Sequence, residues 1–176
     1  MLAVCRAVSK RAAQTLKISE RNNWLLTIAL DHLTLGRAAL YEAVLSAASP
    51  SSFSLPTSSL DSAVFGLRRA GQQIMLPRGL LTRAWLRSLT GACTGPESAQ
   101  SDLDEAWEIA ERGAMKLHLA DIHLYRARLF GSRNEDMKYP WESPAADLAA
   151  AEKLINDCGY HRRDAELADA KRAILG

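Results

Sequence analysis

Leu35-Gly36-Arg37-Ala38-Ala39-Leu40 is the first of three stretches that share the pattern Leu-x-Arg-Ala-x-Leu. The pattern returns 46 and then 43 residues later, as Leu81-Thr82-Arg83-Ala84-Trp85-Leu86 and Leu124-Tyr125-Arg126-Ala127-Arg128-Leu129. A second pattern, Leu-x-x-Ala, runs out of phase with the first at intervals of 43 and 45 residues, starting at Leu60, Leu103 and Leu148. Two interleaved patterns with one period indicate a two-helix unit repeated three times.

Apolar spacing predicts that these units are helical. The stretch 23–46, for example, contains no proline and carries apolar residues at intervals that give one broad face. No run of alternating β-branched residues indicates a strand. We predict helices near 23–46, 59–70, 77–89, 102–112, 117–130, 144–157 and 162–174, and a helix with a buried alanine side over residues 1–20.

The ends of the helices are marked by turn-forming residues. Ser101 or Asp102 is a suitable N-cap for the helix near 102–112. Glycine ends each second helix, where a left-handed residue is needed, at Gly71, Gly113 and Gly159. Stretches rich in proline, glycine and serine predict long surface loops at 47–58, 90–100 and 131–143.

Composition narrows the class of protein. The chain has 176 residues, 48% of them hydrophobic and only 6% aromatic, and its net charge is +2, so we expect no nucleic-acid partner and no membrane partner. No apolar run is long enough to cross a bilayer, and Cys5, Cys93 and Cys158 match no metal or redox spacing. We expect a cytoplasmic protein, with one alternative: residues 1–19 are basic and share their composition with transit peptides.

The repeated units resemble the tetratricopeptide family. Leu35-Gly36 matches the small residue of that family's first helix, and its second-helix alanine is matched by Ala63, Ala106 and Ala151. Leu81-Thr82 and Leu124-Tyr125 depart from the pattern, and the period of 43 to 46 exceeds the family's 34. The chain is most similar to divergent bacterial arrays with extended loops inside the hairpins. Armadillo and HEAT solenoids, whose period is 40–47, stay open as an alternative.

The resemblance implies an all-α fold: a right-handed α-solenoid of about three antiparallel helical hairpins with a capping helix at its C-terminal end. The single domain 1–176 then divides into an N-terminal helix, three repeats and the cap, over residues 1–20, 22–71, 76–113, 117–159 and 160–176. Enlarging a second-helix alanine should overpack the joint between helices.

No motif for catalysis, metal binding or cofactor binding is present in the sequence. His118 and His123 are five positions apart, which places them on different sides of a helix and argues against a zinc site. We therefore expect no enzyme, no metal and no cofactor, but a scaffold that binds another protein or peptide. A regulatory or sensor segment of a larger signalling protein is the alternative, and an enzyme of unrecognised type is a third hypothesis.

Three arginines hold the same place in the repeated pattern: Arg37, Arg83 and Arg126. In tetratricopeptide arrays the first helices line a concave groove, so the resemblance implies a row of unpaired guanidinium groups suited to an acidic or extended peptide. We add three further residues of these helices to the predicted groove: Tyr41, Arg87 and His123. The alternative is that each arginine forms an internal ion pair with a neighbouring helix.

The tryptophans divide into two groups. Trp24, Trp85 and Trp107 occupy helical positions and are expected in the core. Tyr139 and Trp141 lie in a predicted loop, where they either recognise a partner or hold the loop against the protein.

Overall fold

The computed structural model describes residues 1–46, 50–131 and 138–176, and this part of the chain is helical without any strand. The elements are α1 Leu2–Arg21, α2 Leu25–Leu45, the 3₁₀ helix η1 Pro50–Phe53, α3 Ser54–Arg69, α4 Leu76–Leu89, α5 Ala99–Arg112, α6 Lys116–Phe130, α7 Pro144–Cys158, the 3₁₀ helix η2 His161–Arg163 and α8 Asp164–Leu175. The all-α prediction is confirmed, and every helix predicted from the sequence is present.

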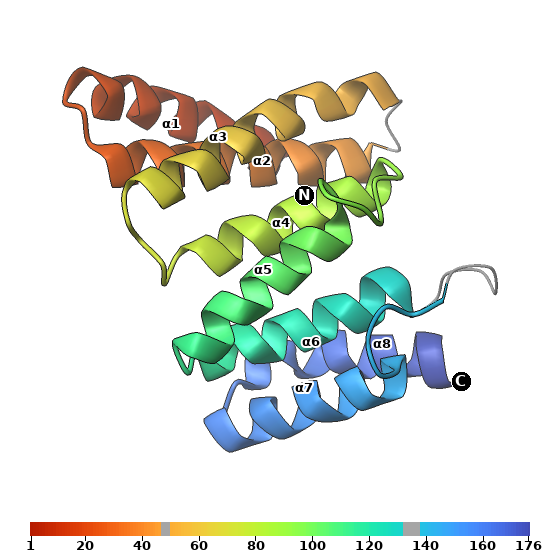
Figure 1. Cartoon of the computed structure of the whole chain (residues 1–176). Helices are drawn as coiled ribbons and strands as arrows, with labels where there is room; N and C mark the ends of the chain where they lie inside the picture. The colour runs from red at the N-terminus through yellow and green to blue at the C-terminus, as the bar shows by residue number, and fades with distance from the viewer. Residues whose placement is uncertain (47–49, 132–137) are drawn as a thin grey trace.

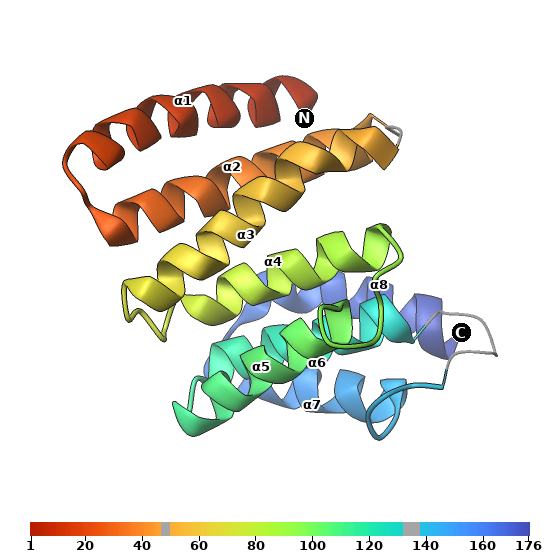
Figure 2. The ribbon, with the colours of Figure 1, turned by 45° about the horizontal axis from the view of Figure 1, so that its top comes forward.

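Successive helices pack on one another from α1 at the top of Figure 1 to α7 and α8 at the bottom. Helices two apart in sequence also touch, in the order α2, α4, α6 and α8. Arg37 of α2 meets Thr82 of α4, and Tyr41 meets Trp85, so α2 and α4 run in the same direction. Figure 2 shows α1 as the outermost helix, lying along α2.

Two helices begin three or more residues earlier than the sequence predicted. The structure starts α5 at Ala99, because Ser98 accepts a hydrogen bond from the backbone N–H of Ser101 and the Ser101 hydroxyl lies 2.9 Å from the N–H of Ser98. This reciprocal capping box makes Ser98 the N-cap, and the predicted Ser101 or Asp102 cap is wrong. Helix α3 starts at Ser54, five residues before the predicted boundary, because Pro56 lies in the first turn, where no N–H is required. Residues 47–49 and 132–137 of the predicted loops lie outside the described residues.

The glycines at the helix ends are partly as predicted. Gly71 and Gly159 have φ of 66° and 62°, the left-handed conformation expected of a C-cap region. Gly113 does not, since its φ is −89°, and the left-handed residue after α5 is Ala114 with φ 49°.

Small residues let α2 and α3 approach closely. A Cβ atom on Gly36 would lie 2.7 Å from the side chain of Leu60, and one on Gly66 would lie 2.8 Å from the Cβ of Ala29. The three second-helix alanines, Ala63, Ala106 and Ala151, are completely buried, as predicted. Close helix crossings of this kind need small side chains because the backbones leave no room for larger ones.

The core follows the length of the molecule in three clusters. The first joins α2 and α3 to Leu86 of α4, the second is centred on α4 and α5, and the third links α6, α7 and α8. Trp107 packs against the second cluster, but Trp24 is 53% exposed, so its predicted place in the core is wrong. Among the described residues, no helix combines the length and the apolar character needed to span a membrane.

Candidate functional site

A groove runs along the side of the molecule formed by α2, α4, α6 and the start of α8. It consists of a cavity of about 660 Å³ and an adjoining one of about 410 Å³. The two cavities share five lining residues: Tyr41, Trp85, Tyr125, Arg163 and Glu166. Each of the four helices contributes side chains, so the groove depends on the order in which these helices contact one another.

Aromatic side chains line the middle of the groove. The rings of Tyr41 and Trp85 lie edge to face with centroids 5.1 Å apart, and Tyr125 lines both cavities beside them. Tyr41 is 49% exposed, while Trp85 and Tyr125 are half-buried. Burial raises the pKa of the Tyr125 hydroxyl, which is therefore neutral at ordinary pH.

Arg37 and Arg78 form a basic corner at one end of the groove. The Nη2 atom of Arg37 donates to the carbonyl oxygen of Arg78 at 3.1 Å, and its Nε atom donates to the Thr82 hydroxyl at 2.9 Å. Neither arginine forms an ion pair with a carboxylate in residues 1–46, 50–131 and 138–176. Burial lowers the pKa of Arg37, and the like charge of Arg78 acts in the same direction.

Ion pairs occupy the opposite end of the groove. Arg163 donates to Asp121 at 2.7 Å and to Glu166 at 2.6 Å, and Arg128 lies 3.2 Å from Glu166. These two arginines and two acids are paired, whereas Arg162, which lines the same cavity, donates to the Tyr160 hydroxyl and has no carboxylate partner in the described part of the chain. The basic corner has two arginines without such a partner.

His118 lies between the two ends. Its Nε2 atom lies 3.2 Å from the carbonyl oxygen of Ile74 and therefore carries the proton. Its Nδ1 atom is buried and has no hydrogen-bond partner within residues 1–46, 50–131 and 138–176. Burial lowers the pKa of His118, so the ring is neutral at physiological pH.

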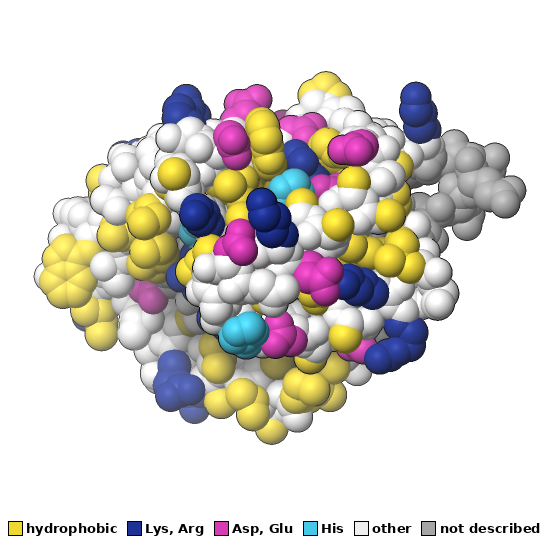
Figure 3. Space-filling model, turned by 90° about the horizontal axis from the view of Figure 1, so that it is seen from below, with side chains coloured by type: hydrophobic (Ala, Val, Ile, Leu, Met, Phe, Trp, Pro, Cys, Tyr) yellow, Lys and Arg dark blue, Asp and Glu magenta, His cyan; other side chains and the backbone are white. Residues whose placement is uncertain are grey.

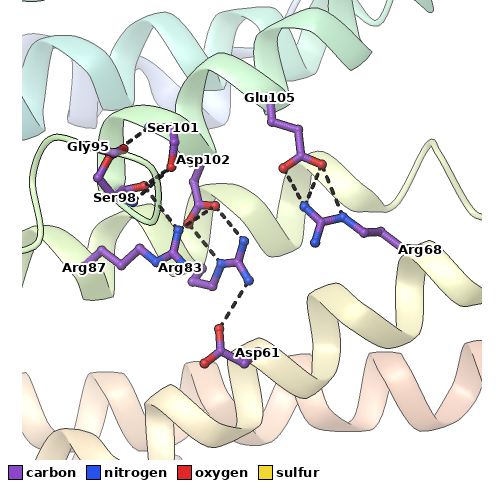
Figure 4. Close-up of polar contacts among 9 residues, drawn as sticks. All are labelled: Asp61, Arg68, Arg83, Arg87, Gly95, Ser98, Ser101, Asp102 and Glu105. Atoms are coloured by element: carbon purple, nitrogen blue, oxygen red, sulfur yellow. Dashed lines mark hydrogen bonds and ion pairs between the residues drawn. The ribbon is translucent and has the colours of Figure 1, made fainter.

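Arg83 and Arg87 are turned away from the groove, contrary to the prediction. Figure 4 shows both side chains, from α4, converging on Asp102 of α5, with Asp61 of α3 on the far side of Arg83. The Nη2 atom of Arg83 is 2.7 Å from Asp102, and the Nη1 atom of Arg87 is 3.1 Å from it. The expectation of a free guanidinium group is wrong for Arg83, and the predicted groove position is wrong for both residues. The alternative of internal ion pairs describes them.

Arg126 is also held internally. Its guanidinium lies 4.5 Å from the ring centre of Trp141 and 5.6 Å from that of Trp107, and one Nη atom is 3.5 Å from Asp104. The indole N–H of Trp141 donates to the same carboxylate at 2.8 Å. Arg126 is buried, so the prediction that its charge is free in a groove is wrong.

His123 and Tyr139 meet at a third internal acid. The Nδ1 atom of His123 is 2.5 Å from Asp147, and the Tyr139 hydroxyl donates to the other oxygen of that carboxylate. His123 therefore faces α7 instead of the groove. Together with the contacts of Trp141, this arrangement favours the alternative in which the 138–143 segment is held against the helices.

The contacts between α2 and α4 do not pair the residues that the sequence pattern aligns: Tyr41 contacts Trp85, whereas the pattern aligns it with Arg87. Arg37 contacts Thr82, the residue before Arg83, and one residue is about 100° of helix rotation. The sequence pattern aligned residues that the helices turn to different faces. The sequence pattern did not identify four residues that line the groove: Arg78, Trp85, Tyr125 and Arg163. Tyr41 and Trp85 are 44 residues apart, which fits the repeat period, so this spacing could have indicated Trp85.

Other types of site find little support in the described part of the chain. No group of three or more histidine, cysteine, aspartate or glutamate side chains is placed to hold a metal ion among these residues. On the face shown in Figure 3, basic and acidic side chains are interspersed, and neither sign covers it. The groove is thus the feature of the described structure that combines a concave shape, aromatic side chains and an unbalanced charge. No family model, curated protein or solved structure matches this chain.

Proposed function

We propose that this chain is a non-catalytic scaffold for protein interaction, and that it binds an extended segment of a partner protein in the groove along α2, α4, α6 and α8. In this proposal the helices form a right-handed solenoid of tetratricopeptide type. α2, α4 and α6 are the first helices of three hairpins, and α8 is the cap. The sequential contacts of α2, α4, α6 and α8 support this arrangement.

The aromatic side chains in the groove are the observation that carries the proposal. Tyr41 is 49% exposed although its ring packs edge to face against Trp85, and Tyr125 of α6 continues the aromatic surface. Tyrosine and tryptophan side chains that keep exposed ring surface are enriched where proteins bind one another, because they bury a large area at little entropic cost. Their arrangement across three helices suits an extended chain.

The acids in the groove do not favour catalysis. Asp121 and Glu166 are both held by Arg163, and Asp121 also accepts a hydrogen bond from the Tyr160 hydroxyl. A general base must be free to accept a proton from its substrate, and these carboxylates already have partners.

Selection of binders from a displayed library of short random linear peptides, using the full chain as target, tests the proposal. We expect families of peptides whose affinity falls roughly tenfold or more when Tyr41 is replaced by Ala, since it lies at the centre of the groove. Phe65→Ala is the matched control, because Phe65 is an exposed aromatic on α3 that lines neither cavity. If no peptide is enriched, or if Tyr41→Ala and Phe65→Ala have equal effects, the groove is not the binding site.

A further inference from the structure

We infer that the basic corner of Arg37 and Arg78 takes an anionic oxyacid group of the bound segment, a carboxylate or a phosphate, and so fixes the direction in which that segment lies. The inference rests on the proposed function and adds the chemistry and the place of one contact. The contact involves Arg37 and Arg78 instead of the row of Arg37, Arg83 and Arg126 predicted from the sequence. Arg83 and Arg126 are already paired inside the protein.

The charge balance along the groove is the first argument. Arg163 and Arg128 are matched by Asp121 and Glu166 at one end. At the other end, Arg37 and Arg78 have no carboxylate partner in the described residues. Arg162, at the end that holds Arg163, also lacks a carboxylate partner in these residues, but it stands alone and donates to the Tyr160 hydroxyl. An anionic ligand group therefore meets two such guanidinium groups at the basic corner and one at the end that holds Arg163.

The orientation of Arg37 is the second argument. The Thr82 hydroxyl and the carbonyl oxygen of Arg78 each accept one hydrogen bond from its guanidinium, and the same hydroxyl donates to that carbonyl at 2.8 Å. A guanidinium has five N–H donors, so two bonds fix its plane and leave three for an oxyacid. A guanidinium held in place loses less entropy when it binds a carboxylate or phosphate.

Two helix ends reinforce the corner. Ile74 and Met75 precede α4, and Leu117 and His118 lie in the first turn of α6, and all four line the same cavity as Arg37 and Arg78. Neither helix has a side-chain N-cap or an acidic residue in its first turn. The positive ends of both helix dipoles thus have no acidic side chain in their own first turns.

The aromatic side chains of the groove determine which kind of side chain the bound segment carries next to its anionic group. Arg37 and Tyr41 are one helical turn apart on α2, and Tyr41 contacts Trp85. A bound segment that places its acidic group at the basic corner therefore puts a neighbouring side chain on these rings. We expect selected peptides to carry an acidic residue close to an apolar or aromatic one.

The test compares variants of the protein with variants of a selected peptide. Arg78→Gln removes an exposed charge whose side chain makes no hydrogen bond within the described residues, so the fold should be kept, and Arg37→Gln is the second variant. We expect each variant to bind the acidic peptide roughly tenfold or more weakly than the original chain does. The affinity for the same peptide with Asn or Gln in place of the acid should not change. Arg128→Gln is the control, because Arg128 is already paired with Glu166, and it should change both affinities equally.

A phosphoserine version of the peptide separates the two sources of the anion. Tighter binding than the carboxylate peptide, lost in Arg78→Gln, assigns the corner to phosphate, and the reverse order assigns it to a carboxylate. The inference is overturned if the selected peptides bind in a manner sensitive to Tyr41→Ala, yet carry no acidic residue and do not respond to Arg78→Gln. That result leaves the proposed function standing, whereas a selection without any groove binder removes both.

Discussion

Arg83 and Asp102 form a two-point ion pair between α4 and α5, with Nη2 2.7 Å from one carboxylate oxygen and Nε 3.0 Å from the other. Both side chains are buried, and Asp102 is 1% exposed. A bidentate pair in such surroundings fixes the rotation of α4 against α5, because neither charge can return to water without its partner.

Replacing Arg83 by Ala should therefore lower stability and leave binding intact. Arg87 remains 3.1 Å from Asp102 and partly compensates, so we expect a loss of about 2–4 kcal/mol in the free energy of unfolding, towards the lower part of the range for broken buried pairs. Urea unfolding measures it, and peptide affinity per folded molecule should not change.

Asp61→Asn is the control for this variant. Asp61 approaches Arg83 at 3.2 Å, but its side chain is exposed, so its loss should cost less than about 1 kcal/mol. An unchanged urea midpoint in Arg83→Ala would contradict the internal role of the arginine.

Ala106→Leu should overpack the joint between α5 and its neighbours. Ala106 has no exposed surface, and a larger side chain has to displace packed atoms, at a cost of about 1–3 kcal/mol. Thermal unfolding measures the effect, with Ala149→Leu as the matched control, because Ala149 lies in α7 and is exposed. Equal melting temperatures for the two variants would show that the site near Ala106 accepts the added volume.

The pH dependence of stability should contain a contribution from His118. Burial lowers the pKa of its ring in the folded protein, so the unfolded chain takes up a proton first as the pH falls. This contribution to stability is complete above the unfolded pKa of about 6.5, and is lost as the pH falls from there towards the folded pKa.

Comparison with His118→Gln isolates this term, since the two proteins differ in this side chain alone. Urea unfolding between neutral and mildly acidic pH should show a shallower decline for His118→Gln than for the original chain. Parallel declines would mean that His118 titrates alike in the folded and unfolded states.

Trp141 should contribute to stability through the segment that follows residue 137. Its ring lies edge to face with Phe130 at 5.2 Å and covers Arg126, and its N–H binds Asp104. Trp141→Ala should cost about 2–4 kcal/mol, while Trp141→Phe, which loses the hydrogen bond but keeps a ring, should cost about 1 kcal/mol. Chemical unfolding measures both losses. If Trp141→Ala leaves the free energy of unfolding unchanged, Trp141 does not stabilise the fold, and the alternative of a role in recognition is favoured.

The sequence predicted the positions of the helices better than it predicted which of their side chains line the groove. Periodic apolar residues predicted α7 to within one residue, because this signal acts within a few residues of chain. The early start of α3 was missed because a stretch rich in serine and proline was interpreted as a loop. Pro56 is tolerated there by its place in the first turn, which composition does not reveal.

The set of side chains that line the groove depends on how each helix is rotated about its own axis. A repeated sequence pattern does not determine this rotation. Arg37, Arg83 and Arg126 share a sequence position, but each helix is turned by its own packing, and a difference of one residue moves a side chain by about 100°. Gly36 lets α2 approach Leu60 closely, whereas Thr82 and Tyr125 stand in its place in the other two patterns. Only the assembled helices show that Arg37 and Tyr41 reach the groove while Arg87 and His123 do not.

Helix α1 has few fully buried side chains, and we expect it to unfold before the rest of the protein. This helix buries only Ala12 and Ser19, and side-chain contacts such as Thr15 and Ser19 with Asp31 hold it to α2. A segment with so little buried apolar surface detaches at a small fraction of the global unfolding free energy. Its backbone amides should exchange with deuterium well before those of α4 and α5, and a protease should cut near Asn23 while the rest of the molecule stays folded.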